Sequence, residues 1–200
     1  NLVTYSQDFT DASWNAVAST IDVTAYSGST PDGQTAGFEI SEPSTTSTHA
    51  LRASHSFTSG QSYTLSVFAK KSTSDWCQLL FGAAAFPTLF QNFNLSTGEK
   101  GTGSGFDSSE IQDVGNGWYR ISITATASST ASTDIYIALT DNTDSVRLPS
   151  YAGDGSSGVY IYGAQLEAAP PPPPLLPPSG ASVPSALETL TLPAPNLPWP

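Results

Sequence analysis

The fold of this chain is decided by the stretch Gly115-Asn116-Gly117-Trp118-Tyr119-Arg120-Ile121-Ser122-Ile123-Thr124-Ala125. Asn116-Gly117 is the strongest short hairpin signal in the sequence, because both central residues of a type I′ turn need positive φ. After the turn the polarity alternates, so that Tyr119, Ile121 and Ile123 point to one face of a strand. Arg120, Ser122 and Thr124 point to the other face. The stretch therefore predicts a β-hairpin that buries one face.

Other segments read as strands in the same way. Tyr63–Lys70 alternates apolar and polar residues, with Phe68 as the exception on the polar face. Asp134–Leu139 and Val159–Tyr162 are β-branched or aromatic on both faces, which is typical of central strands. The weaker strand candidates are Leu2–Tyr5, Ile21–Ala25, Ala36–Ile40, Ala50–Phe57, Trp76–Phe81 and Leu89–Leu95.

Turn-forming residues separate these segments. Pro31-Asp32-Gly33 is a β-turn signature, and Asp8–Trp14 predicts one short helical turn. The glycines between residues 98 and 105 predict a flexible loop. No stretch of 12 residues shows the 3.6-residue periodicity of an amphipathic helix. About ten short strands with turns every 8–15 residues predict an all-β, antiparallel β-sandwich.

The chain divides into a globular part and a proline-rich tail. Residues 1–167 form one predicted domain, which is long enough to bury a proper core. Residues 168–178 are rich in proline and predict a polyproline II stalk, in which Pro170–Pro178 would span roughly 28 Å. Residues 179–200 predict an extended tail that docks on another chain. Its candidate docking residues are Leu187, Leu190, Leu192, Leu197 and Trp199.

Charge excludes two classes of partner. The formal net charge is −11 and the chain has six Lys and Arg residues. Phosphate neutralisation needs clustered cations, so we expect no nucleic-acid partner and no anionic membrane surface. Ser, Thr, Gly and Asn supply most of the polarity, which is typical of extracellular or virion β-proteins. The one cysteine, Cys77, lies in the apolar run Trp76–Phe81 and predicts a buried strand thiol.

Catalytic motifs are weak in this sequence. Gly153-Asp154-Gly155-Ser156-Ser157-Gly158 spells G-x-G-x-x-G, but a predicted strand follows it where a dinucleotide site needs a helix. The two histidines, His49 and His55, could act as the base of a catalytic triad, but the sequence contains no G-x-S-x-G motif to supply the nucleophilic serine. Carboxylate pairs such as Asp107 with Glu110 lie in predicted loops. We therefore expect that the chain is not an enzyme and requires no cofactor.

Glycan binding is the chemistry that the side chains favour. A sugar ring stacks on an exposed aromatic ring, and its hydroxyls need amide or carboxylate partners. Trp76, next to Asp75 and two residues before Gln78, is the first candidate for such a site, and Tyr26 and Tyr151 in predicted loops are the second. Packing of the same rings in the core or at the rim of the sandwich is the alternative.

Five short blocks, in order, resemble a family. They are Asn1–Phe9 followed by Trp14, Ser66–Lys70, Phe93–Gly98, Asp113–Arg120 and Gly163–Glu167. These blocks resemble the carbohydrate-binding-module-like jelly-roll domain that recurs in tailed-phage structural proteins. The resemblance covers residues 1–167 and implies two antiparallel sheets of four or five strands. It also implies a structural calcium near the first and last strands, for which Asp8, Asp11 and Glu167 are the candidates.

The expected function follows from the resemblance and the tail. We expect a non-enzymatic virion structural protein, a decoration, fibre or adhesion component of a tailed phage, that displays a glycan-binding jelly-roll β-sandwich. Residues 168–200 would bind other virion subunits, in a homo-oligomer or multicopy assembly on the virion surface, and host-surface glycans would be the other partners. Two alternatives remain open. One is a carbohydrate-binding module of a secreted glycan-degrading enzyme, and the other is a subunit of an extracellular filament.

Overall fold

The computed structural model describes residues 1–16 and 20–169. These residues form β-strands and connecting segments, with no helix among them. Accordingly, the described residues contain no helix that could span a membrane. The predicted stalk beyond Ala169 and the docking residues Leu187, Leu190, Leu192, Leu197 and Trp199 lie outside the described residues.

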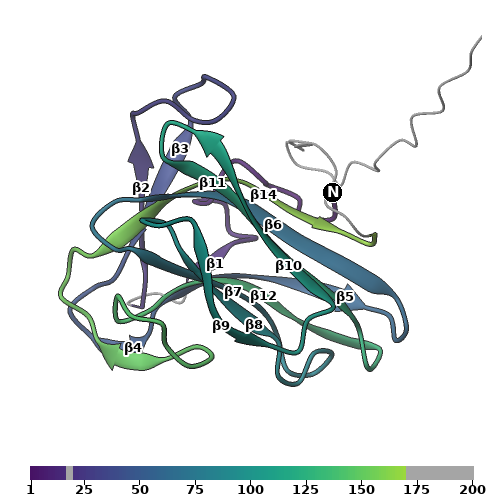
Figure 1. Cartoon of the computed structure of the whole chain (residues 1–200). Coiled ribbons are helices and arrows are strands. Elements are labelled where there is room, and N and C mark those ends of the chain that lie inside the picture. Colours follow the sequence, from purple (N-terminus) through teal and green to yellow (C-terminus); the bar gives the residue numbers. More distant parts are fainter. Residues whose placement is uncertain (17–19, 170–200) are drawn as a thin grey trace, which may run out of the picture.

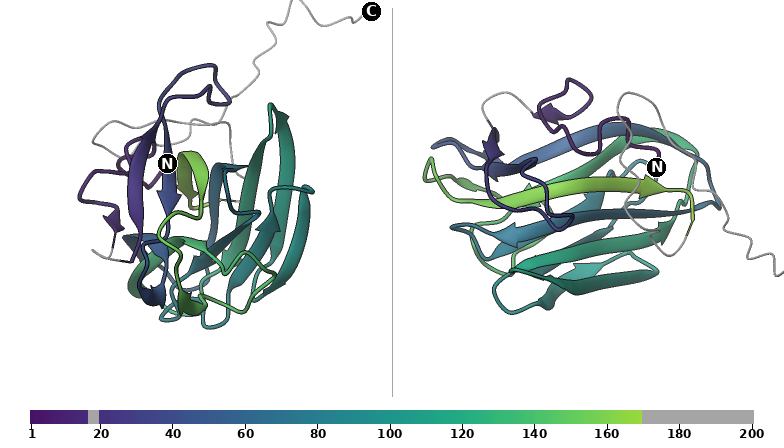
Figure 2. Two further views of the ribbon diagram at one scale, coloured as in Figure 1. Left: turned by 90° about the vertical axis from the view of Figure 1, so that its left-hand side faces the viewer. Right: turned by 90° about the horizontal axis from the view of Figure 1, so that it is seen from above.

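Two six-stranded antiparallel sheets face each other as two layers (Figures 1 and 2). The first sheet has the order β1 (Asn15–Ala16), β5 (Ala50–Phe57), β12 (Ala131–Leu139), β7 (Trp76–Phe81), β8 (Phe90–Asn94) and β9 (Glu99–Ser104). The second sheet has the order β10 (Ser108–Gly115), β11 (Trp118–Thr126), β6 (Ser62–Lys71), β14 (Gly158–Glu167), β3 (Gly37–Ser41) and β2 (Asp22–Tyr26). A separate pair joins β13 (Ser150–Ala152) to β4 (Thr46–Thr48). The all-β sandwich that the sequence predicts is confirmed.

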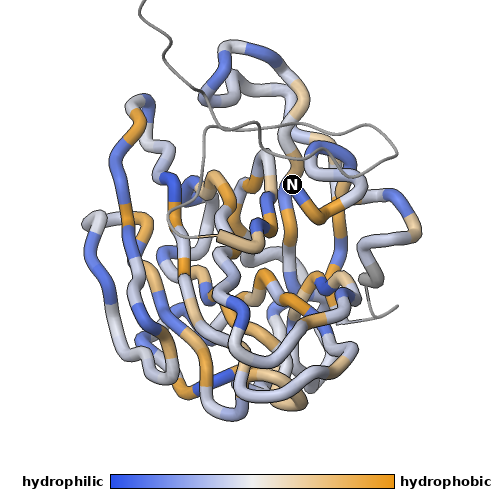
Figure 3. Tube along the Cα trace, turned by 90° about the vertical axis from the view of Figure 1, so that its right-hand side faces the viewer, coloured by the Kyte–Doolittle hydropathy of each residue, from blue (hydrophilic) through white to orange (hydrophobic). Residues whose placement is uncertain are grey.

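The predicted hairpin joins β10 to β11. Asn116 and Gly117 have φ values of 54° and 77°, as a type I′ turn requires. Ile121 and Ile123 pair with Val67 and Leu65 of β6, and all four side chains are completely buried in the core. The apolar face predicted for this strand therefore packs in the core, but Ser122 and Thr124 on the opposite face are buried as well. Figure 3 shows hydrophobic and hydrophilic residues alternating in this way along the strands.

The core lies between the two sheets. Phe57 makes edge-on ring contacts with Tyr63, Phe81 and Phe86, with centroid distances of 4.8 to 5.6 Å. Such pairs stabilise a core beyond the area that they bury. Cys77 belongs to the same core cluster and is completely buried, so the prediction of a buried strand thiol is confirmed.

Four local predictions were wrong. Residues 99–104, expected in a flexible loop, form β9, and Glu110 lies in β10. The segment Leu2–Tyr5 forms no regular strand, although the Leu2 amide donates to the Leu166 carbonyl at 2.7 Å. Asp8–Trp14 forms turns without a helix. For residues 99–104, Glu110 and Leu2–Tyr5, backbone pairing with other segments decides the structure, and local propensity does not report it. Asp8–Trp14 is instead held by hydrogen bonds within the segment.

Candidate functional site

Loops from both sheets meet at one end of the sandwich, on the side where Figure 1 labels β4. Because β14 is antiparallel to both β3 and β6, its first residues lie beside their last: Gly158 pairs with Ser41 and Val159 with Lys71. The Glu42 amide donates to the Ser157 carbonyl and the Ser74 amide to the Gly158 carbonyl, each at 2.9 Å. The loop after β12 of the first sheet reaches the same place.

These loops enclose a polar cleft of about 300 Å³. Three carboxylates line it, and hydroxyl and amide side chains supply most of the remaining wall. Its lining residues are Glu42, Ser74, Thr140, Asp141, Asn142, Tyr151, Ala152, Asp154 and Ser157. We call this feature the acidic cleft.

A buried glutamate organises the acidic cleft. Glu42 is only 5% exposed. Its Oε2 accepts a 2.5 Å hydrogen bond from the Tyr151 hydroxyl, and its Oε1 accepts one of 3.0 Å from the Asp154 amide. The His49 and Tyr151 rings contact each other in an edge-to-face arrangement, with their centroids 4.7 Å apart. Tyr151 is also held by its strand, since it pairs with Ser47 of β4.

The Tyr151 hydroxyl is hydrogen-bonded to one carboxylate and lies within the electrostatic influence of two more. Burial raises its pKa far above the ordinary value, the hydrogen bond to Glu42 raises it further, and so do the charges of Glu42, Asp141 and Asp154. A tyrosine in this setting is a neutral donor at all physiological pH values.

Hydrogen bonds from its own loop stabilise the ionised form of Asp154. Its Oδ2 accepts from the Ser157 hydroxyl at 2.6 Å, and its Oδ1 accepts from the amides of Ser157 and Ser156 at 2.7 and 2.8 Å. These hydrogen bonds hold the pKa of the Asp154 carboxyl well below its usual range. This is the G-x-G-x-x-G segment, and it leads directly into β14, as the loop prediction requires.

One hydroxyl at the acidic cleft has no partner among the described residues. Ser74 is 1% exposed, and its Oγ makes no hydrogen bond there. A buried hydroxyl left without a partner costs about 1–3 kcal/mol. The residue that carries this hydroxyl belongs to the wall of the acidic cleft.

The loop after β12 is fastened to the outer face of the first sheet. Gln78 donates to Asn92 Oδ1 at 2.6 Å and accepts from the Leu148 amide at 2.7 Å. Asn92 in turn donates to Asp144 Oδ1 at 2.9 Å. This network fixes the segment that carries Asp141 into the acidic cleft.

The structure separates the five residues predicted to bind glycan. Of the five, Tyr151 is the one that lines the acidic cleft. Asp75 adjoins it, because the Asp75 amide donates to Asn142 Oδ1 at 2.6 Å, but the Asp75 carboxylate pairs with Lys71. Gln78 is completely buried and holds the loop, so it does not reach a binding surface.

The other two predicted aromatic residues lie elsewhere. Trp76 is half-buried over β9, where a Cβ at Gly101 would lie 2.6 Å from its ring. Tyr26 packs on Tyr160, with ring centroids 4.1 Å apart, and edge-on against Trp118. For both residues the contacts correspond to packing at the rim of the sandwich, which the sequence analysis gave as the alternative to glycan binding.

The predicted calcium residues each have local partners. Asp8 accepts hydrogen bonds from the amide and hydroxyl of Thr10, and Asp11 accepts one from the Ser13 amide. Glu167 contacts the Asn1 amino group at 2.8 Å. Residues 1–16 and 20–169 contain no group of three or more His, Cys, Asp or Glu side chains that could hold a metal ion. The structure therefore does not assemble Asp8, Asp11 and Glu167 into a cluster, and calcium binding stays a prediction.

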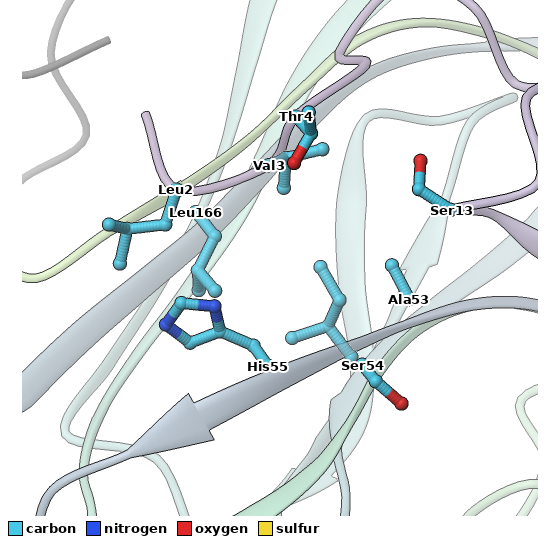
Figure 4. Close-up of a pocket in the computed structure, with 9 residues that line it drawn as sticks. Leu2, Val3, Thr4, Ser13, Ala53, Ser54, His55 and Leu166 are labelled. Atoms are coloured by element: carbon cyan, nitrogen blue, oxygen red, sulfur yellow. The ribbon is translucent and has the colours of Figure 1, made fainter. Parts of the chain in front are cut away.

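A second cavity lies under the N-terminal segment (Figure 4). Its volume is about 40 Å³, and its lining includes Leu2, Val3, His55 and Leu166. Burial lowers the pKa of His55, which packs edge-on against Phe57. The space accommodates water but not a sugar ring, so we treat it as a packing gap.

Sequence reasoning missed Glu42, Ser74 and Asp154. Each follows or precedes a strand that was predicted, and the polar residues at strand ends were the available signal. What the sequence did not show is which strand ends are neighbours.

Comparisons with known proteins are sparse. No protein-family model matches the sequence, and no curated protein matches it either. A solved structure with some similarity is the enzymatically active domain of tailspike protein 4 from bacteriophage CBA120, at 13% sequence identity and a TM-score of 0.35. The match covers 74% of this chain and 17% of that chain, so this chain corresponds to about a sixth of that structure.

Proposed function

We propose that this chain is a non-enzymatic, glycan-binding β-sandwich module that binds a sugar residue in the acidic cleft. The observation that carries the proposal is that Glu42 and Asp154, from two separate loops, and Tyr151, from β13, meet at one polar cleft. Binding sites of this kind place a few polar groups on a rigid scaffold. A volume of about 300 Å³ is at the lower end of the range for ligand sites, which suits one terminal sugar residue.

The polar groups match what a sugar offers. Carboxylate oxygens accept from sugar hydroxyls, and charge-assisted hydrogen bonds of this kind are about twice as strong as neutral ones. Asp141 is exposed and keeps one oxygen beyond its contact with Thr143. The Ser74 hydroxyl, without a partner in residues 1–16 and 20–169, can donate or accept.

The biological setting we propose comes from the resemblance of five sequence blocks to phage structural domains. In this proposal the sandwich is a jelly roll displayed on a virion surface, in a decoration, fibre or adhesion component. Residues 168–200 attach it to other subunits, and host-surface glycans are its ligands. Many copies on one particle convert weak single-site binding into avidity.

The test is an NMR titration of the full chain with a panel of mono- and oligosaccharides. We expect amide shifts to be concentrated at Glu42, Ser74, Asn142 and Ala152. Asp141→Ala should weaken binding several-fold, whereas Glu110→Ala, an exposed acid on β10, should not change it. Shifts centred on Tyr26 and Tyr160 would move the site to the second sheet, and no shifts with any glycan would refute the proposal.

A further inference from the structure

The sign of the charge in the acidic cleft points to a class of sugar. Three carboxylates, Glu42, Asp141 and Asp154, line it, and none of its described lining residues is Lys, Arg or His. Lys71 lies at the end of the neighbouring strand β6, but its Nζ is paired with Asp75 Oδ1 at 2.5 Å. The cleft is therefore a concentrated negative site without a cation of its own.

The three carboxylates come from three different loops, and their charges all act on the Tyr151 hydroxyl. Glu42 contacts Tyr151 directly, and the charges of Asp141 and Asp154 also reach the Tyr151 hydroxyl and help to keep it protonated. Charges in a partly enclosed cleft are screened less than charges on an open surface. A cation placed there would meet the combined field of all three.

An independent observation shows that the cleft has an unused polar position. Ser74 is 1% exposed, lines the acidic cleft, and has no hydrogen-bond partner for its Oγ among the described residues. An ammonium group offers donors only, so it suits a site with carboxylate and hydroxyl acceptors. A carboxylate on the ligand would instead face three like charges.

We propose that the acidic cleft selects sugar residues that carry a free amino group over neutral and acidic sugars. This inference rests on the proposed glycan-binding function and gives its ligand class. The amino group would lie against Asp141 and Ser74, while ring hydroxyls donate to the remaining oxygen lone pairs of Glu42 and Asp154. Acetylation of the amine removes the charge and is expected to remove the preference.

The experiment compares four probes on the full chain by calorimetry or NMR titration: glucosamine, glucose, N-acetylglucosamine and glucuronate. We expect glucosamine to bind about 5- to 10-fold more tightly than glucose, because charge-assisted hydrogen bonds replace neutral ones. Glucuronate should bind most weakly. The advantage of glucosamine should shrink as salt rises from about 0.02 to about 0.5 M, since the Debye length falls.

Two variants locate the effect. Asp141→Asn keeps the size of an exposed side chain and should reduce the ratio of glucosamine to glucose affinity. Glu110→Gln removes the same charge from β10, outside the cleft, and should leave the ratio unchanged. Equal binding of glucosamine and glucose at all salt concentrations would overturn the amino-sugar preference and leave the proposed function standing. If none of the sugars binds, the proposed function itself is refuted.

Discussion

The Tyr151 hydroxyl donates a 2.5 Å hydrogen bond to Glu42 Oε2, and the two residues are 109 positions apart in the sequence. The bond joins the loop after β3 to the small pair of β13 and β4. Together with the bond from the Asp154 amide, it gives a buried carboxylate two donors. The shape of the acidic cleft depends on this arrangement.

Removing the Tyr151 hydroxyl should destabilise the fold. In Tyr151→Phe the buried Glu42 carboxylate loses one donor, and we expect a loss of about 1–3 kcal/mol in the free energy of unfolding. Urea denaturation measures it. Tyr136→Phe is the control, because the Tyr136 hydroxyl reaches Asp134 Oδ2 only at 3.4 Å. Equal stabilities of the two variants would contradict the role given to Tyr151.

Stability should fall in alkali. Burial and the hydrogen bonds donated to Glu42 and Asp32 raise the pKa values of Tyr151 and Tyr162 above the ordinary value. A raised pKa in the folded state gives stability that is present below the unfolded pKa of about 10 and is lost as the pH rises above it. Denaturation curves between about pH 8 and 11 should show this loss.

Tyrosine absorbance provides a direct check on the same groups. In Tyr162→Phe and Tyr151→Phe one late-ionising tyrosine should disappear, and the alkaline loss of stability should become shallower. If all eight tyrosines ionise together near pH 10, the expectation is wrong.

Acid should loosen the loop after β12. Burial opposes ionisation of Asp144, but hydrogen bonds from Asn92 and Thr102 outweigh it and lower the pKa. A lowered pKa gives stability that is present above the unfolded value of about 4 and is lost as the pH falls through the folded value. Asp144→Asn should flatten the acid limb of a stability profile, whereas Asp22→Asn, on the exposed part of β2, should leave it unchanged.

Gly153 should not tolerate a side chain. A Cβ there would lie 2.1 Å from the Pro43 carbonyl oxygen, and a backbone atom cannot move aside cheaply. We expect Gly153→Ala to cost about 1–3 kcal/mol of unfolding free energy and to distort the acidic cleft. Thermal unfolding of this variant against Ser150→Ala, at an exposed position of β13, is the measurement. A melting temperature equal to that of the control would refute the close approach.

Cys77 should be chemically silent in the folded protein. Complete burial raises the pKa of its thiol to about 12, so almost no thiolate is present at pH 8. A thiol reagent should modify it only after denaturant is added. Rapid modification of the native chain would mean that β7 opens far more readily than the packing of the core indicates.

The strands were predictable where burial leaves a local pattern. The alternation after Asn116-Gly117 was visible because one face of β11 packs in the core. β9 was not predictable, since its glycines and polar residues carry no such pattern and its pairing with β8 holds it in the sheet. Local composition cannot report a partner strand.

The site was predictable only in part, for a related reason. Tyr151 was found as an aromatic residue in a predicted loop. Gln78 shares a strand face with Trp76, as the spacing implied. The loop after β12 covers Gln78 there, and the Gln78 side-chain amide donates to the Val146 carbonyl and accepts from the Leu148 amide.

The sequence by itself determined that this chain is an all-β sandwich, because the turn residues and alternating strands are local features that short segments express. Only the tertiary structure decided where a ligand can bind. Glu42, Ser74, Asp141, Tyr151 and Asp154 line one cleft. Antiparallel pairing places the ends of β3 and β6 beside the start of β14, and the loop after β12 reaches the same end of the sandwich from the other sheet. Strand order and register link residues more than a hundred positions apart, and no local pattern in the chain encodes them.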